Sequence, residues 1–255
     1  MPTIAVSGSG SGMGAAIRQR CERDGHSVIG IDLRRAEIIA DLGTAAGRAA
    51  ALTEVRRRAD GRLDGLVACA GVATHIEPRS TIVSVNYFGA QALMAGLRDL
   101  LAAGSQPAAV AIGSNSAPFP GMDTPMVSAC LAGDEDEARR IAMTLDGSSV
   151  YAGSKLALTR WVRRNAPTAD WAGAGIRLNA VAPGATMTPM LQAGLDHPDY
   201  GEAIRNFKVP LGGFGTPEQI AATVGFLLGP EAAFCCGSVV FVDGGTDAMF
   251  RPNSF

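Results

Sequence analysis

Short apolar runs alternate with segments of helical periodicity along the whole chain, and neither a linker nor an internal repeat interrupts them. Short, nearly continuous apolar runs are typical of parallel strands that are covered on both faces. The expected strands lie at residues 4–6, 27–32, 37–40, 66–69, 108–112, 176–181 and 238–242, and the main expected helices at 13–23, 44–59, 80–103, 150–165 and 216–228. The alternation predicts an α/β fold in which residues 1–255 form one domain with a doubly wound, seven-stranded parallel sheet.

Composition removes several classes of protein. The chain is 47% hydrophobic and 18% charged and has a net charge of −2, so it is neither disordered nor basic enough to favour nucleic acid as a partner. The two longest uncharged stretches contain polar residues or prolines, so we expect no membrane segment. Five scattered cysteines and three histidines without metal-ligand spacing indicate a cytoplasmic protein with reduced thiols and no metal.

A glycine-rich loop follows the first expected strand and opens the first expected helix. Two registers are possible there: Gly10-x-Gly12-x-x-Ala15, or Gly8-x-x-x-Gly12-x-Gly14. The second is favoured because Gly8 lies just past the end of the strand, where the turn must begin. In either register the bare backbone and the helix N-terminus present N–H groups to a pyrophosphate, which predicts a dinucleotide-binding loop.

The end of the second expected strand carries the residue that selects the dinucleotide. Asp32 lies twenty residues after Gly12, and an acid there can accept hydrogen bonds from both adenosine ribose hydroxyls while repelling a 2′-phosphate. NAD is therefore the expected cofactor. Arg34 and Arg35 follow and could attract that phosphate, so acceptance of NADP stays open. Asp41 and its neighbour Leu42, after the third strand, are expected near the adenine.

Tyr151 and Lys155 are spaced four residues apart, which places both on one face of a helix. An ammonium beside a phenol lowers the phenol's pKa, and a phenol tuned in this way can exchange a proton near neutral pH. Ser114 ends the fifth strand, where its hydroxyl could bind a reacting carbonyl oxygen, and Ser116 competes for this role. Together these residues favour carbonyl–alcohol chemistry.

With these motifs in place, the chain resembles the short-chain dehydrogenase/reductase family along nearly its whole length, and within it the bacterial 3α-hydroxysteroid dehydrogenase/carbonyl reductase branch. The matching motifs are Ser7-Gly8-x-x-x-Gly12-x-Gly14, Asn86 in Val85-Asn86-Tyr87-Phe88-Gly89, Ser114, Tyr151-x-x-x-Lys155, Pro183-Gly184 with Thr188, and Asp243-Gly244-Gly245. The resemblance implies a Rossmann fold and an NAD(H)-dependent oxidoreductase that interconverts a secondary alcohol and a ketone.

The same resemblance implies roles for single residues. Tyr151 would exchange the proton, Ser114 would bind the substrate oxygen, Lys155 would hold the ribose, and Asn86 would support a proton relay through water to Lys155. The implied cofactor contacts are Gly8, Ser11, Gly12, Met13, Gly14, Asp32, Asp41, Leu42, Ala70, Gly71, Tyr151, Lys155, Pro183, Gly184, Thr186 and Thr188.

The chain also departs from the family pattern. Residues 68–71 read Ala-Cys-Ala-Gly where the family has Asn-Asn-Ala-Gly, so strand stabilisation there needs other hydrogen bonds. The fifteen positions from Gly71 to Asn86 indicate a shortened or lost helix. Residues 118–149 are expected to be a helical insertion before the Tyr151 helix, with helices at 124–131 and, led by acids, at 133–145.

Substrate and assembly are the least determined features. The 188–215 segment carries Met190, Leu191, Leu195, Tyr200 and Phe207, which fit either a packed core or a mobile lid over a steroid or another bulky hydrophobic ketone. The insertion borders the usual family subunit interface, so we expect a homodimer rather than a tetramer. The alternatives are a 3-oxoacyl thioester reductase, which would want basic residues beside the pocket, and a non-catalytic NAD-sensing regulator.

Overall fold

The computed structural model describes residues 1–198 and 201–254. Within these ranges seven strands form one parallel sheet in the order β3-β2-β1-β4-β5-β6-β7. The strands are β1 (Thr3–Ser7), β2 (Ser27–Asp32), β3 (Ile38–Ile39), β4 (Gly65–Ala68), β5 (Ala108–Ile112), β6 (Arg177–Pro183) and β7 (Val239–Val242). The predicted α/β fold with a seven-stranded parallel sheet is confirmed, and each strand lies within a few residues of its predicted range.

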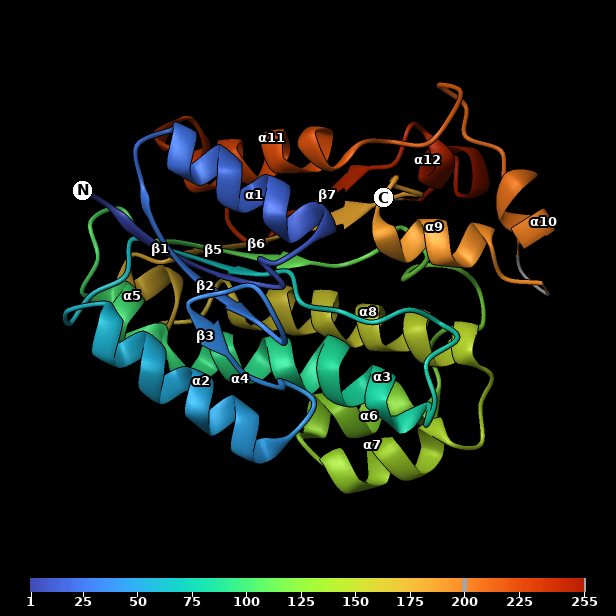
Figure 1. The fold of residues 1–255 in the computed structure, drawn as a ribbon, viewed down its shortest axis with the longest axis horizontal. Helices are drawn as coiled ribbons and strands as arrows, with labels where there is room; N and C mark the ends of the chain where they lie inside the picture. The colour runs from blue at the N-terminus through green and yellow to red at the C-terminus, as the bar shows by residue number, and fades with distance from the viewer. Residues whose placement is uncertain (199–200, 255) are drawn as a thin grey trace.

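Helices cover both faces of the sheet (Figure 1). One layer contains α1 (Gly12–Arg23) and α11 (Pro217–Leu228), and the other contains α2 (Ala45–Arg58), α4 (Ala90–Gly96) and α8 (Gly147–Asn165). Each layer closes a separate apolar core on its side of the sheet. Within residues 1–198 and 201–254, no helix is both long enough and apolar enough to cross a membrane.

The long helix predicted over residues 80–103 is broken into four pieces. α3 (Ser80–Val83) runs into a π-helix over Ser84–Gly89, then α4, and after Leu97 the short α5 (Arg98–Ala102). Leu97 leaves helical geometry, with φ −113° and ψ 8°. A π-helix bonds residue i to i+5 in place of i+4, and the spacing of apolar residues does not reveal this change. Such π-turns are frequent at functional sites.

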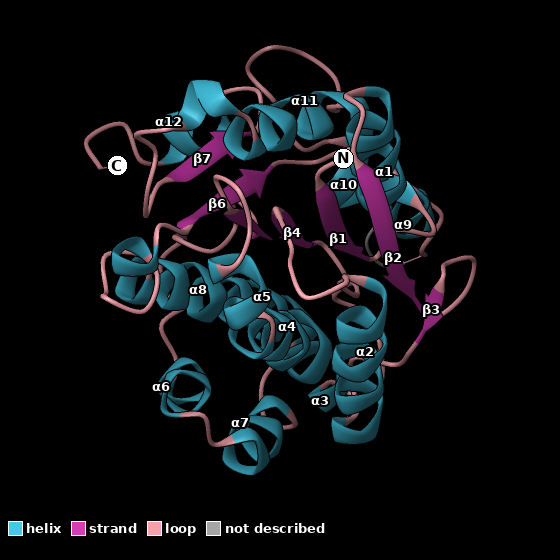
Figure 2. Cartoon of the chain, turned by 90° about the vertical axis from the view of Figure 1, so that its left-hand side faces the viewer, coloured by secondary structure: helices cyan, strands magenta, loops and turns pink. Residues whose placement is uncertain are grey.

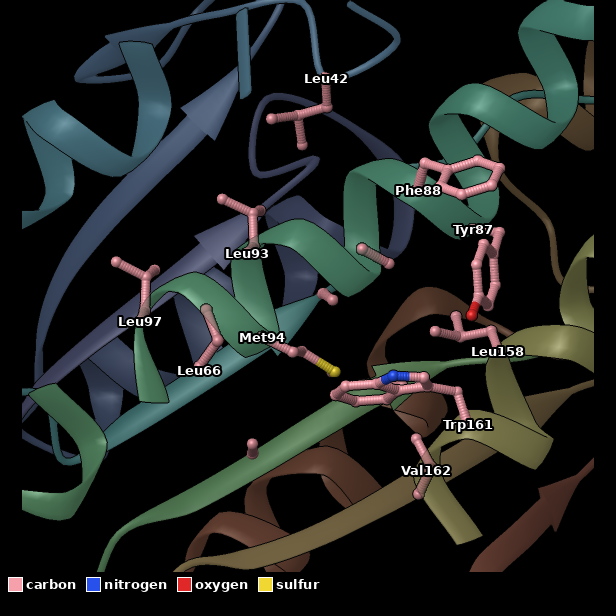
Figure 3. Close-up of a cluster of buried hydrophobic side chains, with 14 of the residues drawn as sticks. Leu42, Leu66, Tyr87, Phe88, Leu93, Met94, Leu97, Leu158, Trp161 and Val162 are labelled. Atoms are coloured by element: carbon pink, nitrogen blue, oxygen red, sulfur yellow. The ribbon is translucent and has the colours of Figure 1, made fainter. Parts of the chain in front are cut away.

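The larger core packs around this broken helix. Figure 3 shows Tyr87 of the π-helix on the side that faces Leu158 and Trp161 of α8, and all three belong to this core. The Tyr87 ring also meets the neighbouring Phe88 ring edge to face, with centroids 4.9 Å apart. Burial raises the pKa of the Tyr87 phenol, so this tyrosine remains a neutral core side chain.

Residues 118–149 contain two helices that lie outside the layer of α4 and α8 (Figure 2). These are α6 (Pro125–Ala132) and α7 (Glu135–Ala142), close to the two expected ranges. α7 is N-capped by Asp134, whose side chain accepts from the backbone N–H of Glu137, and three acids occupy its first turn. α6 packs against α8, and α7 packs against α3 and the π-helix.

The strand end that lacks the family's two asparagines is held by a serine instead. The Ser7 hydroxyl at the end of β1 accepts hydrogen bonds from the backbone N–H groups of Cys69 and Ala70, each at 3.1 Å. Ser7 is buried, so these bonds tie β1 to the turn after β4. No helix forms between Gly71 and Arg79, in agreement with the expected loss of a helix there.

Candidate active site

A cavity of ≈ 270 Å³ lies at the carboxyl edge of the sheet, next to the glycine-rich loop. Ligands bind at this edge in open parallel α/β sheets. Its lining comprises Gly8, Ser11, Gly12, Met13, Gly14, Ile31, Asp32, Leu33, Ala40, Asp41, Leu42, Cys69, Ala70, Gly71, Val72, Val85, Thr188, Pro189 and Met190. The volume is near the lower end of the ~300–1,000 Å³ usual for ligand pockets, and it covers the adenosine and pyrophosphate end of the expected cofactor site.

The glycine loop forms a cradle that side chains would fill. Gly8 and Gly12 have positive φ angles of 71° and 52°. A Cβ on Gly8 would lie 2.8 Å from the backbone nitrogen of Ala70, and one on Gly14 would lie 2.0 Å from the Gly8 oxygen. Gly10 has no positive φ and is absent from the cavity lining. The geometry therefore favours the longer register, and the residues fit a bound pyrophosphate.

Asp32 lies at the end of β2 with its carboxylate facing the loop. One oxygen accepts from the Gly10 N–H at 2.9 Å, and the other accepts from the Arg34 N–H at 3.1 Å. These bonds fix the carboxylate at the cavity wall, where it can accept hydrogen bonds from ribose hydroxyls. Asp41 lies farther along the same wall, its carboxylate turned back to the Gly43 N–H at 2.9 Å.

Some of the expected cofactor residues lie outside this cavity. Pro183 and Gly184, at the end of β6, pack toward β7, and the Gly184 N–H donates to the Val242 carbonyl at 3.0 Å. The hydroxyl of buried Thr186 donates to the Gly184 oxygen at 2.9 Å. Thr188 does line the cavity and caps α9 (Pro189–Leu195). Tyr151 and Lys155 are also outside the lining, beyond Cys69 and Gly71.

Ser114, rather than Ser116, is the serine that affects Tyr151. Ser114 is buried just past β5, and its hydroxyl bonds to that of Ser116 at 2.9 Å and accepts from the Ser116 N–H at 3.2 Å. Ser114 also lies near the Tyr151 phenol and lowers its pKa. Its hydrogen bonds with Ser116 fix the Ser114 hydroxyl at this position.

The expected lowering of the Tyr151 pKa by Lys155 is wrong. Burial dominates and raises the pKa of Tyr151, the Ser114 hydroxyl only partly offsets it, and the Lys155 ammonium is not among the causes. Burial penalises the charged phenolate because it removes water that would stabilise it. The phenol is therefore protonated at neutral pH.

Lys155 is almost fully buried on α8, and burial lowers its pKa to about 8. Its ammonium donates to the Ile112 carbonyl at 2.8 Å. A Cβ on Gly71 would lie 3.5 Å from the Lys155 nitrogen, so the glycine leaves this group open toward the cavity. Burial raises the pKa of the nearby Cys69 thiol to about 12, so this thiol is neutral at physiological pH.

Asn86 lies in the π-helix and has no solvent exposure. Its amide oxygen accepts from the Val72 N–H at 2.8 Å, and its amide nitrogen donates to the Val72 carbonyl at 3.2 Å. Both ends of the side chain therefore hold the backbone of a cavity residue. A Cβ on Gly71 would lie 3.2 Å from the Asn86 oxygen and 3.5 Å from the Lys155 nitrogen, so Gly71 lies beside both side chains.

The described parts of the 188–215 segment form a flap beside the site. Its two ends are joined, because the Met187 N–H donates to the Gly215 oxygen and the Gly215 N–H to the Ala185 oxygen. His197 stacks on His75 from the turn after β4, with ring centroids 5.7 Å apart. Tyr200, one of the residues singled out in the sequence, lies outside the described residues.

An aromatic side chain of this flap clusters with two from other regions of the chain. The Phe250 ring of α12 (Thr246–Phe250) lies 5.3 Å from the ring of Phe119 and 6.4 Å from that of Phe207. Figure 1 shows α9, α12 and α10 (Gly201–Arg205) gathered at one end of the molecule. Local sequence pattern does not reveal such a cluster, because Phe119 and Phe250 are far apart along the chain.

Several cavity residues were missed by the sequence analysis. They are Ile31, Leu33, Ala40, Cys69, Val72, Val85 and Pro189. Most are neighbours of residues that were predicted, so a wider window around each strand end would have found them. Val85 comes from the π-helix and directly precedes Asn86, so it too lies beside a residue that was predicted.

Comparisons with known proteins agree with this geometry. Residues 138–247 match the model of a family described as Enoyl-(Acyl carrier protein) reductase. The chain is 46% identical to a 3-alpha-hydroxysteroid dehydrogenase/carbonyl reductase of Comamonas testosteroni, over 100% of both chains. It is 32% identical to a 2-(S)-hydroxypropyl-CoM dehydrogenase 3 of Xanthobacter autotrophicus, over 96% of both.

Solved structures give the same result. The crystal structure of the 3-alpha-hydroxysteroid dehydrogenase from Pseudomonas sp. B-0831 complexed with NADH superposes with a TM-score of 0.96 and 50% identity, covering 99% of this chain and 100% of that one. The ligand-free aldohexose dehydrogenase of Thermoplasma acidophilum superposes with a TM-score of 0.76 at 22% identity, covering 100% and 96%, and so shares the fold.

Proposed function

Because this chain belongs to the short-chain dehydrogenase/reductase family, we propose that it is an NAD(H)-dependent oxidoreductase that interconverts a secondary alcohol and a ketone. Its substrate is a 3α-hydroxysteroid and the corresponding 3-ketosteroid, or another hydrophobic carbonyl compound. The observation that carries the proposal is the juxtaposition of the Ser114–Tyr151 pair with a glycine-cradled cavity.

The dinucleotide would lie with its pyrophosphate on the glycine loop and its adenosine ribose at Asp32. The ammonium of Lys155 would bind the other ribose, because its bond to the Ile112 carbonyl leaves further N–H donors toward Gly71. When bound, the nicotinamide supplies or accepts the hydride. Thr188 and Met190 border the cavity from the flap, and we propose that the 188–215 segment is a substrate lid.

Ser114 and Tyr151 handle the substrate oxygen. The Ser114 hydroxyl, oriented by Ser116, donates to the carbonyl oxygen, and the protonated phenol of Tyr151 donates the proton that completes an alcohol. In the reverse direction the phenolate accepts this proton. The positive charges of Lys155 and of the oxidised cofactor would oppose the burial that raises the pKa of the phenol. Asn86 positions Val72 at the cavity and would support proton transfer to Lys155 through water.

The proposed substrate class is supported by an aromatic cluster that includes a residue of the 188–215 segment. Phe119, Phe207 and Phe250 offer aromatic surface to a bulky apolar body. A 3-oxoacyl thioester reductase is the weaker candidate, because the relative that matches the chain over its whole length at 46% identity is a 3-alpha-hydroxysteroid dehydrogenase/carbonyl reductase. An intact Ser114–Tyr151–Lys155 set argues against a regulator that binds NAD without turnover.

A substrate panel tests this assignment. Purified protein with NAD is expected to form NADH, followed by absorbance, from a 3α-hydroxysteroid and much more slowly from the 3β epimer. A 3-oxoacyl thioester with NADH should give little turnover. Reduction of the thioester faster than of any ketosteroid would replace the proposed substrate class, and binding of NADH without turnover of any carbonyl would favour the regulator.

We expect Lys155 to lower the free energy of unfolding, although the protein needs this lysine for activity. Its pKa of about 8 in the folded protein lies below the 10.5 of an ordinary lysine, so the buried charge destabilises the fold fully below pH 8, and this penalty fades as pH rises from 8 to 10.5. Lys155→Met should raise the free energy of unfolding at pH 7 by about 1–2 kcal/mol, after loss of the bond to Ile112. The gain should shrink at pH 9.5.

Urea denaturation at both pH values, with assays of turnover, measures this. Lys208→Met is the matched control, because Lys208 is the other lysine of the chain and is exposed. The control should change stability by less than about 0.5 kcal/mol. A Lys155→Met protein that is less stable than wild type at pH 7, or that keeps normal turnover, would contradict this role for the lysine.

We also propose that the protein is a cytoplasmic homodimer. α6 packs over α8 and α7 over α3, so the outer face of this layer is already covered. The open edge of the sheet is apolar, because all four β7 side chains are partly exposed. Phe226 of α11, which packs on β7, and Phe234, five residues before β7, are exposed. Unpaired apolar edges are commonly covered by a partner. All five cysteines are free thiols, in keeping with a reducing compartment.

Light scattering after size exclusion tests the dimer. Wild type should have twice the mass of one chain, and Phe234→Asp should yield monomers. Met143→Asp is the control, because Met143 is exposed just after α7 and should leave the dimer intact. A dimer that resists Phe234→Asp but dissociates on Met143→Asp would place the interface on the α6–α7 face instead.

A further inference from the structure

Helix α7 lies on the outside of the molecule, yet two of its side chains reach residues that support the cofactor cavity. Glu135 and Arg139 lie one turn apart and make contacts with α2 and with the π-helix. Glu137 and Arg140 of the same helix pair with each other at 2.7 Å and are largely exposed. Figure 2 shows α7 beside α3 and below α2. The helix therefore has an inner pair and an outer pair of charges of the same kind.

The first inner contact links α7 to the adenine end of the cavity. The Glu135 carboxylate accepts from two nitrogens of the Arg48 guanidinium, at 2.5 and 3.3 Å, and these side chains are only 25% and 11% exposed. The same guanidinium donates to the backbone carbonyl of Leu42 at 3.2 Å. Leu42 and its neighbour Asp41 line the cavity. Glu135 thus orients the Arg48 guanidinium, and Arg48 in turn holds the loop that contains Asp41 and Leu42.

The second inner contact reaches the same wall from another side. Arg139 donates to the Ser84 hydroxyl at 2.7 Å, and Ser84 is fully buried at the start of the π-helix. The next residue, Val85, lines the cavity. A Cβ on Gly43 would lie 3.1 Å from the Val85 side chain, so the π-helix and the loop held by Arg48 lie against each other. Both contacts of α7 therefore support one continuous wall.

We propose that α7 positions the adenine wall of the cofactor site, with Glu135 acting through Arg48 and Arg139 acting through Ser84. This rests on the proposed function, because it assigns the cavity to the dinucleotide. Without Glu135, Arg48 keeps no counter-charge to fix it and turns toward solvent, and the Leu42 carbonyl loses its donor. The loop at Asp41 and Leu42 then has to be ordered when the cofactor binds, and that ordering weakens binding. Neither α7 residue touches the reacting atoms, so both are positioning residues.

Titration of the whole protein with NADH, followed by nucleotide fluorescence, tests the first contact. Glu135→Gln should raise the Kd for NADH about 3- to 10-fold, the range of couplings carried through an intermediate residue. Glu137→Gln removes the same charge from the same helical turn and should change the Kd less than about twofold. The KM for NAD should follow the Kd while kcat at saturating NAD stays at the wild-type value. If Glu135 had a purely structural role, Glu135→Gln would instead lower the melting temperature, and KM would not rise selectively while kcat stayed constant.

A double-mutant cycle tests whether Glu135 acts through Arg48. Arg48→Gln should raise the Kd for NADH at least as much as Glu135→Gln, and the double variant should be no worse than Arg48→Gln alone. Additive losses would contradict transmission through Arg48. Should Glu135→Gln fold poorly, Glu135→Asp keeps the charge but shortens the reach, and a Kd between wild type and the Arg48→Gln value is expected. An unchanged Kd in Glu135→Asp and in Arg48→Gln would overturn the proposal.

Arg139→Gln and Arg140→Gln form the matched pair for the second contact. Arg139→Gln should weaken NADH binding about 3- to 10-fold and Arg140→Gln should not, since Arg140 faces solvent. If wild type fails to bind NADH at all, the proposed function fails. If wild type binds NADH but Glu135→Gln and Arg139→Gln bind it as tightly as their controls, the role of α7 fails and the proposed function stands.

Discussion

Tyr151→Phe should lower kcat for oxidation of a 3α-hydroxysteroid by about 10³-fold while the Kd for NADH changes less than about twofold. The ring and its packing on α8 remain, and only the hydroxyl that exchanges a proton with the substrate is lost. The substrate oxygen can then still bind Ser114, but the group at residue 151 that exchanges its proton is missing. Steady-state turnover and NADH titration of the same preparation separate the two quantities.

Tyr87→Phe is the control for this loss. Tyr87 also carries a buried phenol with a raised pKa, but its hydroxyl lies in the core beside Leu158 (Figure 3). Tyr87 is not part of the cavity lining. This variant should keep turnover within about threefold of wild type and alter mainly stability. A Tyr151→Phe protein that retained more than about a tenth of wild-type kcat would exclude the phenol as the general acid and base.

Asp32→Ser should shift the preference between the two nicotinamide dinucleotides by about 10²- to 10³-fold toward NADP. The carboxylate that accepts ribose hydroxyls is lost, and so is the charge that repels a 2′-phosphate. Arg34 and Arg35 remain exposed next to the position and can then pair with that phosphate. The measured quantity is the ratio of kcat/KM for NAD to kcat/KM for NADP.

The comparison variant is Asp41→Ser. Asp41 lies on the same cavity wall but turns its carboxylate toward the Gly43 N–H, so its removal should lower affinity for both dinucleotides with little change in their ratio. Equal shifts in the ratio for the two variants would mean that the charge of the cavity as a whole, and not Asp32, selects NAD.

Features fixed by neighbouring residues could be predicted from the sequence. The glycine register, the strand ends that carry Asp32 and Ser114, and the cap of α7 at Asp134 all depend on residues within one or two turns of each other. Helix periodicity also gave the position of α8, and with it the shared face of Tyr151 and Lys155. Sequence reasoning works there because sterics and local hydrogen bonds decide the outcome.

Features that depend on partners distant in sequence could not be predicted. Arg48 meets Glu135 across 87 positions, and Arg139 meets Ser84 across 55. The pKa of Tyr151 was predicted in the wrong direction because spacing on a helix reports the neighbouring ammonium but not the burial of the phenol. The π-helix and the use of both ends of Asn86 on Val72 likewise require the folded neighbours.

Transfer of deuterium from a 3α-hydroxysteroid labelled at the carbinol carbon tests the central assignment most directly. Wild-type protein, NAD and the labelled steroid should yield NADH that is one mass unit heavier, in amounts equal to the ketone formed, because the hydride passes directly between the two carbons. Unlabelled NADH, or ketone formed without NADH, would contradict the account of this site.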